Sequence, residues 1–259
     1  MHSPLSLLRL AVRDTLVGVV PSALRALVSR GADERSESKT LVSTSTAATT
    51  DEYPKAAYDA AFHQAIEAEE RPQAERLADY VSEMFPEVEH VYDFGCSGGI
   101  YVRALQERLG ARATVTGFEF SPEAVAQAAS PAVQLANLTE PLALIKPAEP
   151  TLGYCYEVLE HIADAHWQPV LENLTRLSDV LLFTAALPGQ GGTHHINCRK
   201  RLDWIRRFGQ LGWVVDLDAT EHLVNYMRQG YHLGWFVQNA MVLVPHNRPS
   251  PITTFSKYY

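Results

Sequence analysis

Two short polar segments carry the side chains with the clearest capacity for chemistry. Glu157, Glu160 and His161 lie in the string EVLEHI, and a helix starting at Glu157 would place all three on one face. His195 lies in a later polar segment, GQGGTHHIN, which follows an apolar run. Imidazoles can accept or orient a proton near neutral pH. We therefore expect His161 and His195 to be catalytic residues.

A turn of small residues, VYDFGCSGG, could bind a ligand through its backbone. An apolar run ends in Asp93 and continues into Gly95, Cys96, Ser97 and Gly99. The turn does not fit the dinucleotide pattern G-x-G-x-x-G, because positions 97 and 100 are Ser and Ile. Small residues let a ligand approach the backbone closely, and a following helix would direct its first N–H groups at that ligand. Cys96 is then a small space-filling residue, and Ser97 fits the turn if its φ stays negative.

Polar residues also follow the next strands. Glu119 ends the strand in VTGFEF, where its carboxylate could accept both hydroxyls of a ribose, and Phe120 comes next. Asn137 in ANLTEPL could offer an amide to an adenine edge, while Leu138 could cover the adenine face. Each position also has a simpler interpretation, because Glu119 can be a solvated strand end and Asn137 a turn residue.

The segments between these residues alternate between strand and helix patterns. Short apolar runs predict strands over 90–94, 114–120, 132–136, 153–158, 179–185, 213–217 and 235–244. Helical spacing predicts helices over 101–109, 122–129, 163–177 and 199–210. This alternation indicates an α/β fold with a mainly parallel sheet and right-handed crossovers, in which ligands bind beyond the carboxyl ends of the strands.

The first part of the chain differs from the rest. Apolar residues at helical spacing predict an amphipathic helix over 1–30, which packs on the domain or a partner, or makes weak contact with a membrane surface. Residues 31–52 are rich in Ser, Thr and Ala and predict a flexible linker. From residue 53 the pattern is helical again, in two segments separated by Pro72. We therefore expect the ligand-binding domain over 53–259.

Composition restricts the function classes. The chain has 259 residues, of which 46% are hydrophobic and 20% charged, as expected for a packed globular domain. The formal net charge of -8 argues against a broad electrostatic grip on nucleic acid. The three cysteines lack the spacing of a zinc site or a disulfide framework, so a reducing, cytoplasmic location fits best. The oligomeric state does not follow from the sequence.

Four motifs occur along the chain in the order DFGCSGG, FEFSPEAV, ANLTEPL and EVLEHI. Together they resemble the motifs of class I S-adenosylmethionine-dependent methyltransferases over about residues 74–244. Ser97 replaces the middle glycine of the family's first motif, and Asn137 stands where Asp is common. EVLEHI resembles the subgroup that includes ubiquinone-biosynthesis O-methyltransferases and small-RNA 2′-O-methyltransferases. The resemblance implies a Rossmann-like, seven-stranded, mainly parallel sheet with helices on both faces. It implies S-adenosylmethionine as cofactor, bound by Asp93, Gly95, Cys96, Ser97, Gly99, Glu119, Phe120, Asn137, Leu138 and Glu157.

The acceptor is less constrained than the cofactor. Short substrate insertions and the acidic net charge favour transfer to a small molecule, at oxygen. In the small-RNA branch a similar E-x-x-E-H motif and a later His hold a divalent metal, which would here involve Glu157, Glu160, His161 and His194 or His195. The motif also occurs in methyltransferases without a metal, and we expect none here. The alternatives are a metal-assisted RNA 2′-O-methyltransferase and a catalytically silent domain that binds the cofactor or a partner.

Two further segments could contribute to acceptor binding. The basic residues of RKRLDWIRR, at 199–207, either form a solvated helix face or attract an anionic acceptor. Tyr226, Tyr231, His232 and Trp235 lie between the last two predicted strands, where class I enzymes often carry a substrate loop.

Overall fold

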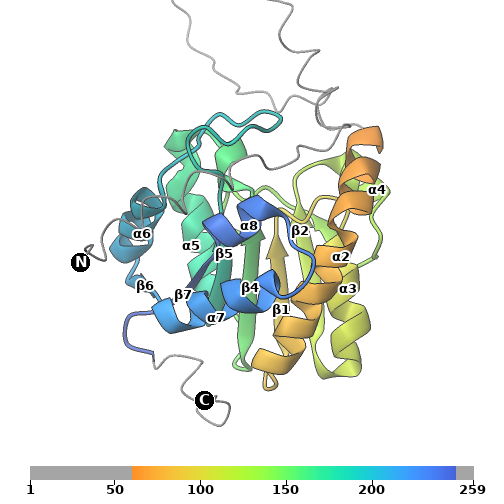
Figure 1. Ribbon diagram of the computed structural model, residues 1–259, viewed down its shortest axis with the longest axis horizontal. Helices are drawn as coiled ribbons and strands as arrows, with labels where there is room; N and C mark the ends of the chain where they lie inside the picture. Colours follow the sequence, from red (N-terminus) through yellow and green to blue (C-terminus); the bar gives the residue numbers. More distant parts are fainter. Residues whose placement is uncertain (1–59, 249–259) are drawn as a thin grey trace, which may run out of the picture. The chain divides into compact units, whose positions relative to one another are not determined.

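A computed structural model describes residues 60–248, with side chains from residue 69 onward. Seven strands form one sheet in the order β3-β2-β1-β4-β5-β7-β6, with helices on both faces (Figure 1). The strands are β1(His90–Phe94), β2(Thr114–Glu119), β3(Val133–Leu135), β4(Thr151–Tyr156), β5(Val180–Thr184), β6(Trp213–Val215) and β7(Met241–Pro245). All neighbouring pairs are parallel except those that involve β7, which runs antiparallel to β5 and β6. The predicted fold class is confirmed.

The helices cover the two faces of the sheet in separate groups. They are α2(Ala60–Met84), α3(Ile100–Leu109), α4(Pro122–Ala126), α5(Trp167–Leu177), α6(Arg201–Gln210), α7(Leu217–Arg228) and α8(Gly234–Asn239). Buried residues of α2, α3, α7 and α8 form one core cluster with one face of the sheet. Those of α5 and α6 form a second cluster with the other face. Every residue of β4 and β5 is buried, as expected for central strands covered on both sides.

The order of the strands locates the ligand site. The chain builds β1, β2 and β3 outward in one direction and then returns to place β4 on the other side of β1. Ligands bind at such a switch point, beyond the carboxyl ends of the two central strands. The turn after Phe94 and the segment after Tyr156 both lie there.

The prediction of two helical segments separated by Pro72 was wrong, because α2 continues through this proline. A proline inside a helix costs about 3 kcal/mol, since it removes a backbone hydrogen bond and crowds the preceding turn. The face of α2 that follows Pro72 packs into the core, where Leu77, Tyr80 and Val81 are each 1% exposed. Burial of this face offsets the local cost of the proline.

The end of the domain also differs from the prediction. The predicted strand over 213–217 stops at Val215, because Asp216 caps a helix by accepting a hydrogen bond from the backbone N–H of Ala219 at 2.9 Å. The loop expected after it is largely this helix, α7. The start of the predicted strand over 235–244 is instead helix α8, which buries Phe236 against the ring of Tyr156.

The N-terminal predictions lie outside the described residues. This applies to the helix over 1–30, the linker over 31–52 and the first residues of the predicted domain, so these remain predictions. Among the described helices, none combines the length and apolar character that crossing a bilayer requires.

Candidate functional site

The turn after β1 is shaped by two glycines in the left-handed region. Gly95 has φ 81° and Gly99 has φ 76°. A Cβ atom on Gly95 would lie 2.5 Å from a methyl group of Val158, and one on Gly99 would lie 2.6 Å from a methyl group of Val133. Larger residues are therefore excluded by both conformation and space. The contact with Val158 also brings the turn against the EVLEHI segment.

Ser97 adopts a positive φ of 49°, which corrects the expectation of a negative value. This conformation points its backbone N–H at Glu119, whose Oε2 accepts a hydrogen bond at 2.8 Å. A non-glycine residue in this region costs of order 1 kcal/mol. The hydrogen bond to a carboxylate accounts for the tolerance of Ser97 here, because charged hydrogen bonds exceed that value.

Glu119 connects the two turns that follow β1 and β2. Its Oε2 accepts from Ser97, and its Oε1 accepts from the backbone N–H of Ser121 at 2.7 Å. The side chain is 8% exposed. Each carboxylate oxygen has further acceptor capacity, so the group can also bind the two ribose hydroxyls of a cofactor. Binding of the ribose by Glu119 stays a prediction.

Asp93 and Cys96 are buried beneath this turn. Asp93 is 2% exposed and its Oδ2 has no hydrogen-bond partner. Burial, followed by the charge of Glu119, raises the pKa of Asp93 well above its usual range. Burial likewise raises the pKa of the Cys96 thiol, which packs under Gly117. A neutral, enclosed thiol is a space-filling group and not a nucleophile.

The predicted adenine-binding residues occupy different environments. The side-chain oxygen of Asn137 accepts from the backbone N–H of Thr139 at 3.0 Å and from its hydroxyl at 2.8 Å, as in an Asx turn. Leu138 is 6% exposed and belongs to the core, whereas Phe120, at the end of the neighbouring strand, is 45% exposed. Phe120 is therefore the most accessible apolar surface for an adenine ring among these three. Binding of adenine by this group stays a prediction.

Glu157 does not start a helix, which corrects the expectation of a shared helical face. It has φ 50°, and only a single 3-10 turn, Leu159–His161, follows. Its carboxylate accepts hydrogen bonds from the amides of Gln190, at 2.6 Å, and Asn239, at 3.0 Å. Gln190 and Asn239 also bond to each other at 2.9 Å.

This amide network was not predicted from the sequence. Gln190 lies in the polar segment GQGGTHHIN, which was a detectable signal. Asn239 is 2% exposed at the end of α8, inside a segment that resembled a strand, so nothing in the sequence indicated its role.

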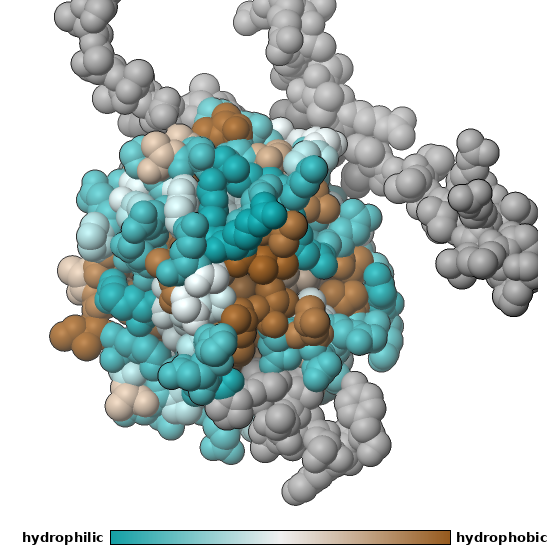
Figure 2. Space-filling model, turned by 90° about the vertical axis from the view of Figure 1, so that its left-hand side faces the viewer, coloured by the Kyte–Doolittle hydropathy of each residue, from teal (hydrophilic) through white to brown (hydrophobic). Residues whose placement is uncertain are grey.

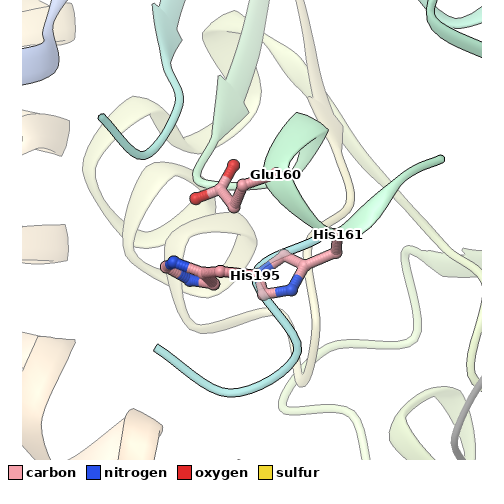
Figure 3. A group of neighbouring side chains, drawn as sticks. All are labelled: Glu160, His161 and His195. Carbon is pink, nitrogen blue, oxygen red and sulfur yellow. The ribbon is translucent and has the colours of Figure 1, made fainter. Parts of the chain in front are cut away.

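Glu160, His161 and His195 form one group (Figure 3), with potential ligand atoms all within 4.8 Å of one another. Glu160 is 0% exposed, and neither carboxylate oxygen has a hydrogen-bond partner among the described residues. Burial, and then the charge of Glu157, raises the pKa of Glu160 well above its usual range. His194, next in sequence to His195, is exposed and does not belong to the group.

Both imidazoles of this group are held neutral. Burial, followed by the neighbouring His195, lowers the pKa of His161 to about 4. Burial also lowers the pKa of His195. The two rings are 5.0 Å apart between centroids. Neutral imidazoles next to a carboxyl can accept a proton or bind a divalent cation.

Backbone hydrogen bonds connect EVLEHI, which carries Glu160 and His161, with GQGGTHHIN, which carries His195. The carbonyl of Glu160 accepts from the N–H groups of Ile196 and Asn197, each at 2.9 Å. The amide of Asn197 donates to the carbonyl of Ile162 at 3.0 Å. The prediction that EVLEHI and GQGGTHHIN meet at the edge of the sheet agrees with this geometry.

The basic helix segment makes its own ion pairs. Arg199 and Arg207 both contact Asp164, at 2.5 and 2.7 Å, and Arg206 contacts Asp203 at 3.4 Å. Figure 2 shows the face that carries α6, where hydrophilic residues surround a hydrophobic patch. These pairs favour a solvated helix face over a site for an anionic acceptor.

Comparison with known proteins agrees with the fold. Residues 91–179 match the family model described as a methyltransferase domain. The sugar N-methyltransferase KedS8 from Streptoalloteichus has a similar structure, with 13% identity and a TM-score of 0.54, covering 82% of this chain and 100% of that one. A Haloferax volcanii methyltransferase, solved in complex with a methyltransferase activator, shows 16% identity and a TM-score of 0.51, covering 74% and 97%. No protein with curated annotation matched.

Three observations now coincide. The sheet has parallel strands with a reversed β7 between β5 and β6. The glycine turn and Glu119 lie at its switch point, and the family model covers this part of the chain. Residues 91–179 therefore match a methyltransferase domain, and the fold is similar to that of a methyltransferase of known structure.

Proposed function

We propose that this enzyme transfers a methyl group to an oxygen atom of a small-molecule acceptor. The observation that carries the proposal is the group of Glu160, His161 and His195 beyond the carboxyl end of β4. A hydroxyl acceptor must lose its proton, and a neutral imidazole is suited to receive it. The lowered pKa values of both histidines keep them neutral at pH 7.

The chain's contribution to the reaction is alignment and proton removal. S-adenosylmethionine, when bound, supplies a methyl group on a positively charged sulfur that leaves readily. The turn at Gly95 and the carboxylate of Glu119 fix the donor, and His161 or His195 orients the acceptor hydroxyl and accepts its proton. The three cysteines are free, which supports action in a reducing, cytoplasmic compartment.

The test is a screen of small hydroxyl and amine compounds with isotopically labelled donor, followed by mass spectrometry of the products. We expect an O-methylated product. His161→Asn and His195→Asn should each lower kcat by about 100-fold without changing cofactor affinity. His194→Asn is the matched control, because that histidine is exposed and outside the group. Products methylated only at nitrogen would contradict the proposal.

A second candidate, transfer assisted by a divalent cation, is favoured by one observation. Glu160 offers two carboxylate oxygens without partners close to two neutral imidazoles, which is a donor set suited to a divalent ion. The RNA form of this alternative lacks a matching basic surface in the α6 segment, where Arg199 and Arg207 pair with Asp164.

Metal removal separates the two candidates. Activity should survive dialysis against a chelator if His161 or His195 acts as a base alone. The cation-assisted reaction would be supported if chelation abolished activity and Mn²⁺ or Zn²⁺ restored it. In Glu160→Gln, neither chelation nor added metal should then change the activity. Methylation of a short RNA in the same assay would favour the nucleic-acid alternative.

A further inference from the structure

The segment between β5 and α6 holds the imidazole of His195 through a backbone atom. Nδ1 of His195 lies 3.3 Å from the carbonyl oxygen of Gln190. A carbonyl oxygen can only accept a hydrogen bond, so Nδ1 carries the proton in this contact. Neither carboxylate oxygen of Glu160 has a hydrogen-bond partner among the described residues, so Nε2 of His195 does not donate to that group. The neutral ring is therefore held with its proton on Nδ1 and a lone pair on Nε2.

Gly192 leaves the space that this ring occupies. A Cβ atom on Gly192 would overlap Nε2 and Cε1 of His195 and would lie 2.7 Å from Cδ2. Such close approach to three atoms of one ring places the added carbon over the face of the ring. The lone pair of Nε2 lies in the ring plane, so Gly192 covers the face and leaves the lone pair accessible. A larger residue at this position would displace the ring.

The side chain of Gln190 anchors the segment to the end of β4 and to α8. Its amide nitrogen donates to Oε2 of Glu157 at 2.6 Å, and its amide oxygen accepts from Asn239 at 2.9 Å. The amide has one possible orientation, because a carboxylate only accepts hydrogen bonds and the amide oxygen must then face the other donors. The same oxygen accepts from the backbone N–H of Leu187 at 3.3 Å. Gln190 thus holds His195 with its backbone and Glu157 with its side chain.

We propose that Gln190 and Gly192 are positioning residues that present Nε2 of His195 to the methyl acceptor. This inference rests on the proposed function, in which an imidazole takes the proton of an acceptor hydroxyl, and it assigns that role to His195. As the acceptor oxygen forms its bond to the methyl group, its O–H bond breaks and the proton goes to the lone pair of Nε2. The resulting imidazolium still donates from Nδ1 to the carbonyl of Gln190, and this hydrogen bond strengthens as the ring becomes charged.

The first test reads the tautomer of His195 without any assay of activity. With isotopically labelled histidine, nuclear magnetic resonance distinguishes a ring nitrogen that carries a proton from one that carries a lone pair. We expect the proton of His195 on Nδ1 in wild-type protein dialysed against a chelator. His195→Asn assigns the signals, because they disappear in that variant. A proton on Nε2 would overturn the proposal.

The second test compares two neighbouring glycines. Gly192→Ala should lower kcat roughly 10-fold with the KM for S-adenosylmethionine unchanged, because the displaced ring no longer aligns with the acceptor. Gly191→Ala is the matched control, since its Cβ would meet no atom within 4 Å, and it should retain the wild-type kcat. Urea unfolding should give similar midpoints for both variants. Equal kcat values in the two variants would contradict the role of Gly192.

The third test removes the anchor. Gln190→Met keeps the size of the side chain but loses its amide hydrogen bonds, so we expect a mixture of tautomers at His195 and a roughly 10-fold lower kcat. Gln168 makes the same type of bond to Glu172, at 2.8 Å, on the exposed side of α5. Gln168→Met should therefore match the wild type. A single tautomer and the wild-type kcat in Gln190→Met would show that Gln190 does not position the ring.

Failure of this inference can be told apart from failure of the proposed function. A protein that methylates hydroxyl compounds but holds the proton of His195 on Nε2 contradicts the positioning role alone. A protein with the proton on Nδ1 that methylates no hydroxyl compound contradicts the proposed function, and with it the use of Nε2 as a base.

Discussion

Glu119 and Glu160, at the two ends of the site, differ in their hydrogen bonding. At the ends of β1 and β2, Glu119 receives two backbone hydrogen bonds, from Ser97 and Ser121, at 2.8 and 2.7 Å. Beyond β4, Glu160 is fully buried and has no hydrogen-bond partner among the described residues. The first end is thus organised before a ligand binds, whereas the second retains groups whose charge and protonation can change. Binding and proton chemistry require such a difference.

The largest effect should come from the organised end. Replacement of Glu119 by Ala removes the carboxylate that fixes the turn at Ser97 and that we expect to bind the ribose. Affinity for S-adenosylmethionine, measured by calorimetry, should fall roughly 100-fold. Glu123→Ala is the control, since Glu123 is exposed at the start of α4. Unchanged affinity in Glu119→Ala would remove the basis for the comparison between the two ends.

The glycine turn offers a matched pair of substitutions. Gly95→Ala places a Cβ 2.5 Å from Val158 in a residue with φ 81°, so the free energy of unfolding should fall by about 3 kcal/mol. The Cβ added by Gly98→Ala would meet no atom within 4 Å. This substitution should therefore change the free energy of unfolding by less than about 0.5 kcal/mol. Urea unfolding of both variants measures the difference. Equal effects would indicate that the contact with Val158 does not constrain the turn.

Much of the organised end could be predicted from the sequence. The strand at 90–94 was located correctly, and Glu119 was placed at a strand end, because short apolar runs followed by small or acidic residues report local structure directly. The left-handed conformation of Ser97 was missed, since it depends on a hydrogen bond to a residue on another strand.

The other end depends on contacts between distant segments. The resemblance placed Glu160 and His161 with His194 or His195, but only the structure shows that His195 is the one that joins them. The bond of Glu157 to Asn239 follows from how α8 packs and has no local sequence signal. Helix α7 was missed because its capping residue, Asp216, lies in a run that is otherwise typical of a strand.

The pH dependence of stability tests the end of the site beyond β4, which contains His161. His161 has a folded-state pKa of about 4, below its usual 6.5, so the folded protein disfavours the protonated form. Stability is therefore full above pH 6.5 and is lost as the pH falls from 6.5 towards 4. His161→Asn should flatten this part of the unfolding profile, whereas His194→Asn should not. An identical pH profile in His161→Asn would show that this imidazole is not buried in its neutral form.

Ser97 provides the smallest and most local test of the organised end. Ser97→Gly removes the side chain from a residue with φ 49°, so the free energy of unfolding should rise by about 1 kcal/mol while cofactor binding is retained. Ser97→Val should lose binding, because a β-branched residue is disfavoured at this φ and would displace the N–H from Glu119. Calorimetry and urea unfolding of the two variants measure these effects. If Ser97→Val bound the cofactor as tightly as the wild type, the bond between Ser97 and Glu119 would not organise the site, and the contrast with Glu160 would rest on the bond from Ser121 alone.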